Sequence, residues 1–276
     1  MTGTTVGPLI PVRARSAIAL ALASAVGLVA FGWPFLTDPG SALDTSHSAD
    51  APWLFVLLLP LLAAIILAEL SRGSLDAKTV ALLGMLAAVG AGLRALGPGT
   101  AGLEPSFLVI ILGGRVFGRG FGFVLGALTV FAGALVTGGV GPWLPFQMLG
   151  SAWVGLFAGG LPRCSGRAER LVLAGYAVVS GLAYGMLLNL WFWPFASYGP
   201  EVSYAPDASI AENIHHYAVF WVTTSLGWDI PRGVLNALLV MGIGGPVLAA
   251  LRRAARRAAF DAVVVFDSES EGSGAN

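Results

Sequence analysis

The chain has 276 residues, of which 56% are hydrophobic and only 11% charged, and its mean hydropathy is +0.80. This composition excludes an ordinary soluble domain and indicates a protein with several membrane-spanning helices. The formal net charge is zero, but it says little about partners because the charges are unevenly distributed along the chain. The single cysteine, Cys164, excludes a disulfide framework and a cysteine-based metal site.

Apolar segments long enough to cross a bilayer follow one another along the chain. We predict spans at 16–36, 53–70, 79–96, 106–118, 121–138, 144–161, 171–195 and 217–251. The last segment is too long for one straight span, and Pro231 disfavours helix at the residue before it. We therefore expect an interruption at Gly227–Pro231, with an outer helical arm over 217–227 and the span itself at about 231–251. A cleaved signal peptide is the alternative for the first segment, but its apolar run exceeds a usual signal core.

Basic residues occupy alternate gaps between these segments, and only Arg94 and Arg232 fall in the other set. The basic gaps hold Arg13, Arg15, Arg72, Lys78, Arg115, Arg119, Arg163, Arg167, Arg170, Arg252, Arg253, Arg256 and Arg257. The other gaps carry Asp38, Asp44, Asp50, Glu104, Glu201, Asp207, Glu212 and Asp229. Short loops rich in Lys and Arg stay in the cytoplasm, so we expect both termini there and an even number of spans.

Groups suited to catalysis or ion transport are nearly absent at membrane depth. Glu69 and Arg94 lie at span ends, and there is no Ser/His pair, His/Glu metal motif or Asp pair. His215 and His216 are adjacent and point apart on a helix, which makes them a poor metal pair. Phosphate-binding glycine motifs are missing as well. We predict no enzyme activity, no cofactor and no metal, and an energy source on another chain.

Aromatic, amide and a few charged side chains gather instead at the predicted outer ends of the spans. Ligand pockets are mostly apolar and aromatic, with a few placed polar groups. We predict a substrate site made of Glu104, Trp143, Phe146, Gln147, Asn189, Trp193, Trp221, Asp229, Arg232 and Asn236. The alternatives are an interfacial aromatic belt, an Asp229 helix cap paired with Arg232, and interhelical contacts of the two Asn side chains.

Small residues repeat along the third span. Gly84, Ala88 and Gly92 follow one another at every fourth position, and Ala87 with Ala91 forms a neighbouring stripe. Such stripes let another helix approach closely. That helix belongs either to this bundle or to a partner.

Over residues 78–251 the chain resembles the S component of energy-coupling factor (ECF) transporters, the membrane subunit that binds a vitamin-like substrate. The resemblance rests on Val80–Arg94, Leu112–Gly122, Gly138–Gln147 and Leu226–Gly233. It implies an all-α polytopic membrane protein of about eight spans, in which a hairpin precedes the family's six-helix core. We expect a cytoplasmic N-terminus over 1–15, the extra hairpin over 16–77, the core over 78–257 and a cytoplasmic, mostly disordered tail over 258–276.

The resemblance also implies a mechanism and partners. Substrate would bind from outside, beneath the loop Gly97–Pro105, in a bacterial cell membrane. A transmembrane T component, contacted at Ala87 and Ala91 with Gly84, Ala88 and Gly92 alongside, and two ATPase subunits would drive import. No nucleic acid is expected as a partner.

The substrate implied is a vitamin or vitamin precursor, with cobalamin-related compounds first and riboflavin, thiamine precursors or queuosine precursors next. An anionic vitamin such as folate or pantothenate would call for a cluster of basic residues at the site, and only Arg94 and Arg232 could form it. The alternatives are a self-sufficient secondary transporter or channel, an intramembrane enzyme, and an assembly factor without a ligand.

Overall fold

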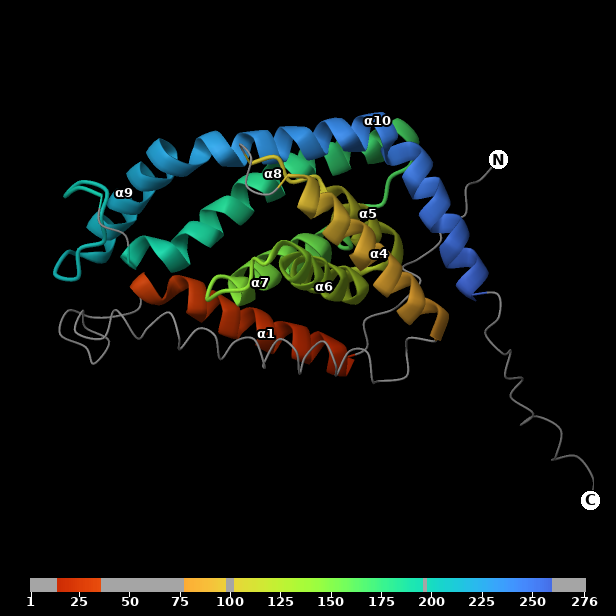
Figure 1. Cartoon of the computed structure of the whole chain (residues 1–276), viewed down its shortest axis with the longest axis horizontal. Helices are drawn as coiled ribbons and strands as arrows, with labels where there is room; N and C mark the ends of the chain where they lie inside the picture. Colours follow the sequence, from red (N-terminus) through yellow and green to blue (C-terminus); the bar gives the residue numbers. More distant parts are fainter. Residues whose placement is uncertain (1–13, 36–76, 98–101, 196–197, 260–276) are drawn as a thin grey trace, which may run out of the picture.

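The structure, a computed structural model, describes residues 14–35, 77–97, 102–195 and 198–259. All regular secondary structure in these ranges is helical. The long helices are α1 (Ala14–Gly32), α4 (Ala77–Leu96), α5 (Ser106–Phe117), α6 (Arg119–Thr137), α7 (Leu144–Ala158), α8 (Gly166–Phe192) and α10 (Leu226–Ala259) (Figure 1). The predicted span at 53–70, the N-terminal 13 residues and the tail from 260 lie outside the described residues.

Several of these helices have the length and composition of membrane spans. Among the described residues, Ala77–Leu96, Arg119–Thr137, Gly166–Phe195 and Ile210–Arg257 are long and apolar enough to cross a membrane. Leu20–Gly32, Ser106–Phe117 and Leu144–Ala158 are shorter apolar helices. The predicted fold class, an all-α polytopic membrane protein, is confirmed.

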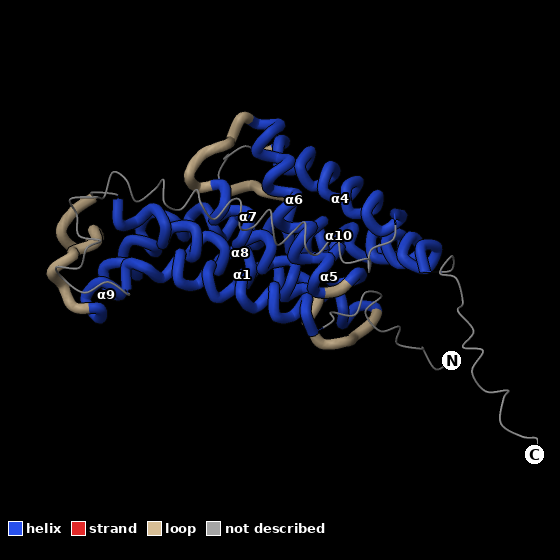
Figure 2. Tube along the Cα trace, turned by 90° about the horizontal axis from the view of Figure 1, so that it is seen from below, coloured by secondary structure: helices blue, strands red, loops and turns tan. Residues whose placement is uncertain are grey.

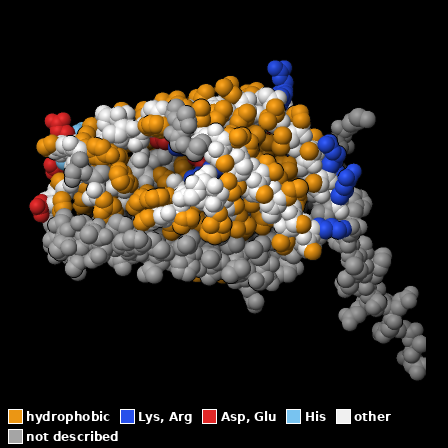
Figure 3. All heavy atoms as spheres, in the orientation of Figure 1, with side chains coloured by type: hydrophobic (Ala, Val, Ile, Leu, Met, Phe, Trp, Pro, Cys, Tyr) orange, Lys and Arg blue, Asp and Glu red, His pale blue; other side chains and the backbone are white. Residues whose placement is uncertain are grey.

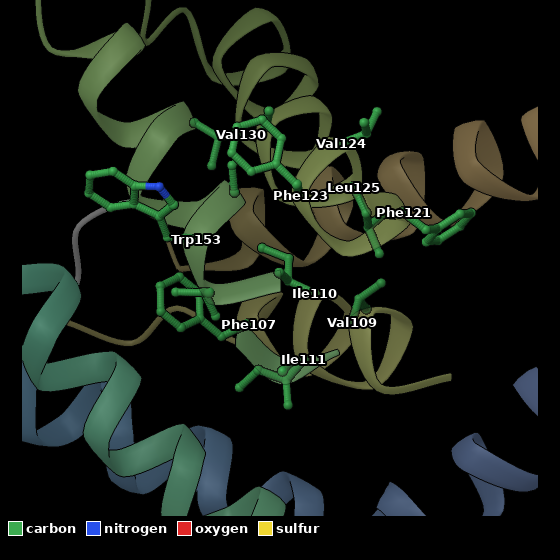
Figure 4. Packing of buried hydrophobic residues seen from close by; sticks show 14 of the residues in the cluster. Phe107, Val109, Ile110, Ile111, Phe121, Phe123, Val124, Leu125, Val130 and Trp153 are labelled. Carbon is green, nitrogen blue, oxygen red and sulfur yellow. The ribbon is translucent and has the colours of Figure 1, made fainter. Parts of the chain in front are cut away.

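Glycines bring the centre of the bundle together. Gly118, with φ of 102°, links α5 to α6 directly, and this backbone conformation favours glycine. A Cβ atom on Gly122 or Gly126 would overlap the backbone of α7, so α6 and α7 lie in close backbone contact. Around this contact α5 and α6 bury Phe107, Ile110, Phe123 and other apolar side chains, with Trp153 of α7 nearby (Figure 4).

Helices α8 and α10 form a second closely packed pair. A Cβ atom on Gly181 would come within 2.8 Å of the Cα atom of Gly233, so the two helices cross backbone to backbone there. The helical run of α9 (Ile210–Phe220), η4 (Trp221–Ser225) and α10 is far longer than a bilayer core. Ile210–Arg257 has 48 residues, or about 72 Å of helix, against a hydrocarbon core of about 30 Å. The end of the α8–α10 pair that carries α9 therefore projects past the loop joining α6 and α7 (Figure 2).

The predicted interruption at Gly227–Pro231 is wrong. Helix α10 runs without a break from Leu226 to Ala259, with Pro231 inside it. Pro231 removes one backbone donor, and packing against α8 on both sides of it holds the helix together. The irregular stretch lies earlier, in the π-helix η4 (Trp221–Ser225), which joins α9 to α10.

The projecting end has a small core of its own. Trp193, in the 3-10 helix η3 (Trp193–Phe195), is fully buried with Tyr217 and Phe220. Its Nε1 atom donates a hydrogen bond to the carbonyl of Val202 at 2.7 Å. Buried Asn213 holds the preceding loop through two hydrogen bonds to the backbone of Ala205.

Charges separate along the long axis of the molecule. In Figure 3 the Asp and Glu side chains gather at the end that carries α9, and Lys and Arg side chains gather at the opposite end. Both kinds also appear in a hollow near the middle of this face.

Candidate functional site

A cavity of about 520 Å³ lies where the ends of α4, α6 and α7 meet α8 and α10. This volume is that of a small-molecule site, for which about 300–1,000 Å³ is usual. Its lining residues are Arg94, Gly97, Gly102, Leu103, Glu104, Ala134, Thr137, Gly139, Trp143, Gln147, Tyr184, Gly185, Leu188, Asn189, Ser225, Trp228, Asp229 and Arg232. The cavity thus combines four ionic side chains with aromatic, amide and hydroxyl groups.

The four ionic side chains form a chain of alternating sign. Arg94 pairs with Oε1 of Glu104. The Nε atom of Arg232 lies 3.5 Å from Oε2 of the same carboxylate. Arg232 also donates through Nη1 to Oδ1 of Asp229 at 2.6 Å. The two positive and two negative charges therefore balance within the cavity wall.

Neutral side chains hold both ends of this ionic chain. Arg94 donates through Nη2 to Oε1 of Gln147 at 2.8 Å. At the other end, Trp221 donates through Nε1 to Oδ2 of Asp229 at 2.9 Å. The guanidinium of Arg232 lies 5.2 Å from the centre of the Tyr184 ring, within cation–π range. The wall is therefore preorganised by contacts from several helices.

The Asn236 side chain joins two segments of the cavity wall. Its Nδ2 atom donates to the carbonyl of Glu104 at 2.8 Å and to the carbonyl of Arg232 at 2.9 Å. The side chain is fully buried. Asn236 thus fixes the segment before α5 to α10.

Among the described residues that line the cavity, Nδ2 of Asn189 is buried without a hydrogen bond. Nε of Arg232 is also buried without a hydrogen bond, although it lies 3.5 Å from the Glu104 carboxylate in an ion pair. A buried donor without an acceptor is costly, of the order of 1–3 kcal/mol. A ligand that offers an acceptor to Asn189 would remove that cost.

Glycines shape the wall at two points. A Cβ atom on Gly185 would overlap the carboxylate of Asp229, so only glycine admits that carboxylate between α8 and α10. Gly102 has φ of 73°, and a Cβ atom there would overlap the carbonyl of Trp228. The segment before α5 therefore rests directly on α10; residues 98–101 of the predicted loop Gly97–Pro105 lie outside the described residues.

The structure brings six of the ten predicted substrate residues to the cavity wall: Glu104, Trp143, Gln147, Asn189, Asp229 and Arg232. Trp221 and Asn236 contact that wall through the hydrogen bonds described above. Phe146 and Trp193 lie elsewhere. Phe146 is fully buried and stacks on Trp191, and Trp193 belongs to the core of the projecting end.

The predicted set omitted several lining residues, among them Arg94 and Tyr184. Tyr184, Gly185, Leu188 and Asn189 follow one another at helical spacing on one face of α8. Residues three and four apart share a helix face. The prediction of Asn189 as a site residue could therefore have been extended to the other three residues on its face.

The small residues of α4 divide between two faces. Ala87 and Ala91 are buried, and a Cβ atom on Gly90 between them would come within 2.6 Å of Thr129 in α6. Gly84, Ala88 and Gly92 are exposed, and a Cβ atom on either glycine would meet no atom of another described residue within 4 Å. Ala87 and Ala91 thus serve packing inside the bundle, and the Gly84–Ala88–Gly92 stripe is open among the described residues.

The opposite end of the bundle carries a second ionic cluster. Buried Glu169 accepts hydrogen bonds from Nε of Arg115 at 2.8 Å and from Nη2 of Arg252 at 2.6 Å. Arg115 also donates to the carbonyl of Leu161 at 3.0 Å. This cluster fastens α5, α8 and α10 at that end. Within the described residues no group of three His, Cys, Asp or Glu side chains suits a metal ion.

The chain matches the model of a known protein family. The model of the ECF transporter, substrate-specific component, matches residues 78–244. No curated protein and no solved structure matches the chain. The matched range includes every residue that lines the cavity and leaves α1 outside. Because the match covers more than half of its length, the chain belongs to the family of ECF transporter substrate-specific components.

Proposed function

We propose that this subunit binds a vitamin-like small molecule in the cavity from the outer face of a bacterial cell membrane. A separate T component and two ATPase subunits then drive its release inside. Membership of the family makes the chain a transporter component and not a member of an enzyme family. The observation that carries the proposal is the cavity of about 520 Å³, in which the balanced ionic chain lies beside aromatic and amide side chains.

Access from outside is supported by the distribution of charge. Exposed Glu201, Asp207 and Glu212 lie at the projecting end, whereas Arg253 and Arg256 lie toward the end of α10. Positively charged ends face the cytoplasm. In this orientation the cavity lies at the outer ends of α4, α6 and α7, and both chain termini are cytoplasmic.

The electrostatics of the wall favour a ligand without net charge. Each arginine of the cavity already has a carboxylate partner. A charged ligand would have to separate one of these pairs, which leaves a poorly solvated charge behind. A neutral ligand with a hydrogen-bond acceptor would instead satisfy the unpaired donor of Asn189 without separating an ion pair.

The volume favours ligands of moderate size. Cobalamin-related compounds, precursors among them, are the first candidates from the family resemblance, and the cavity of about 520 Å³ lies within the usual range for small-molecule sites. Riboflavin, thiamine precursors and queuosine precursors are the next candidates.

The open stripe of α4 is the surface we propose for the T component. Gly84, Ala88 and Gly92 present backbone and methyl groups on an exposed helix face. Small residues allow a second transmembrane helix to approach closely. Buried Ala87 and Ala91 support this face from inside.

Ligand-induced stabilisation of the purified protein tests the proposal. Binding to the folded state alone stabilises it by about 2.7 kcal/mol at a ligand concentration of 100 Kd. One compound in a panel of vitamins and precursors should therefore raise the unfolding temperature in a concentration-dependent way. The variant Asn189→Leu, which keeps the side-chain size and removes the donor, should show a reduced shift. A monodisperse wild-type protein that responds to no compound would contradict the proposal.

A further inference from the structure

Helix α1 lies outside the family match, yet it packs closely on the bundle (Figure 1). One face of it, with Leu20, Ala23, Ala30 and Phe31, is buried. The opposite face is exposed and apolar. Its large members are Ile18, Leu22, Val26, Leu28 and Val29. Among the described residues, α1 therefore lies on the outside of the bundle.

Specific contacts fix α1 against α7. The indole Nε1 of Trp153 donates to Oγ of Ser24 at 2.9 Å. A Cβ atom on Gly27 would overlap the side chain of Leu149, so the helix backbone rests on that leucine. Lipid tails are as apolar as these side chains, so transmembrane helices associate through close packing and hydrogen bonds. Both are present here.

Near the end of α1, Phe31 joins a stack of aromatic rings. Its ring centre lies 5.1 Å from that of Phe146 in an edge-on arrangement and 5.8 Å from that of Trp153. Phe146 stacks in turn on Trp191 of α8, with ring centres 5.5 Å apart and planes at 15°. Phe146 therefore lies between α1 and α8.

This stack lies directly behind the cavity wall. Phe146 precedes Gln147, which accepts the hydrogen bond from Arg94. Trp191 follows Asn189, whose Nδ2 is the free donor, by two residues in α8. The same rings thus set the position of two helices that each contribute a polar group to the cavity.

We propose that α1 is a fixed part of the substrate-binding unit and that Phe31 is a positioning residue for Gln147 and Asn189. The effect on ligand affinity rests on the proposed function; the positioning of α7 and α8 does not. The helix gives this chain a binding unit larger than the part that matches the family.

Two variants of the full chain separate positioning from general stability. Phe31→Ala removes the ring behind the wall. Leu20→Ala removes a buried side chain 11 residues earlier on the same helix, about 16 Å toward the other end. Both should lower the unfolding temperature. Only Phe31→Ala should weaken binding of the compound that stabilises the wild type, by about tenfold, because aromatic contacts orient the wall. Phe31→Leu should recover part of the affinity.

Hydrogen exchange gives a readout that needs no ligand. In Phe31→Ala the amides of Gln147, Met148 and Asn189 should exchange faster than in Leu20→Ala, because the stack behind them is lost. Equal exchange at these amides in the two variants, or equal ligand affinity, overturns the positioning role. A wild-type protein that binds nothing in the panel contradicts the proposed function, and exchange then decides the role of Phe31 by itself.

Discussion

Arg94 at the end of α4 donates a hydrogen bond to Gln147 at the start of α7, 53 residues later, at 2.8 Å. The same guanidinium pairs with Glu104 before α5. One arginine thereby links three segments that surround the cavity. A side chain so placed holds neutral and charged groups around the same cavity.

Gln147→Leu tests whether this link supports binding. The leucine is of similar size and removes the acceptor, so Arg94 loses a hydrogen bond of a type worth about 1.5–3 kcal/mol. We expect the Kd of the stabilising compound, measured by titration calorimetry, to rise by about tenfold or more. Thr137→Val is the matched control, since Thr137 lines the cavity and its hydroxyl donates to the carbonyl of Gly133 in its own helix. An unchanged Kd in Gln147→Leu would remove this residue from the site.

The ionic chain predicts an asymmetric double-mutant cycle. Arg232→Leu leaves Asp229 buried without its cation and should lower the free energy of unfolding by about 3 kcal/mol. Asp229→Leu leaves Arg232 with Glu104 alone and should also be destabilising. The double variant removes both charges and keeps the wall neutral, so it should be more stable than the sum of the two single effects. Thermal unfolding of all four proteins measures the coupling, and strict additivity would show that the pair contributes nothing.

Gly185 predicts a steric effect with a close control. A methyl group at Gly185 overlaps the Asp229 carboxylate, so Gly185→Ala should displace α10 from α8, lower the unfolding temperature and weaken ligand binding. Gly175 lies in the same helix, and a Cβ atom there meets nothing within 4 Å. Gly175→Ala should therefore be neutral or slightly stabilising, since alanine favours helix. Equal behaviour of the two variants would contradict the close packing of Asp229.

Hydropathy and charge predicted the helices because each depends on local sequence. The pairing of Asp229 with Arg232 follows from their spacing of three residues, and it is present. Glu104 was predicted as a site residue, but its contacts with Arg94 and Arg232 were not, because they depend on how α4, α5 and α10 pack. Pro231 misled the prediction for the same reason, since packing against α8 outweighs the loss of one backbone hydrogen bond.

Phe146 illustrates a further limit of sequence reasoning. Its neighbours Trp143 and Gln147 line the cavity, so a ligand contact was the natural prediction. The side chain points instead into a stack with Phe31 and Trp191. Helix rotation decides which of several aromatic residues in one turn faces the cavity, and that rotation is set by helices distant in sequence.

The two faces of α4 predict opposite outcomes for substitutions only a few residues apart. Gly84→Leu and Gly92→Leu add side chains to the exposed stripe, where an added Cβ atom meets no other described residue within 4 Å. Folding and ligand binding should survive, while a bulky side chain keeps a partner helix away. Co-purification with the T component should fall at least tenfold, and uptake of the bound compound should fall with it.

Ala87→Leu and Ala91→Leu enlarge buried side chains between α4 and the bundle. Overpacking there costs about 1–3 kcal/mol, so these variants should lose stability and ligand binding together. If the exposed-stripe variants assemble and transport like the wild type, the T component docks elsewhere.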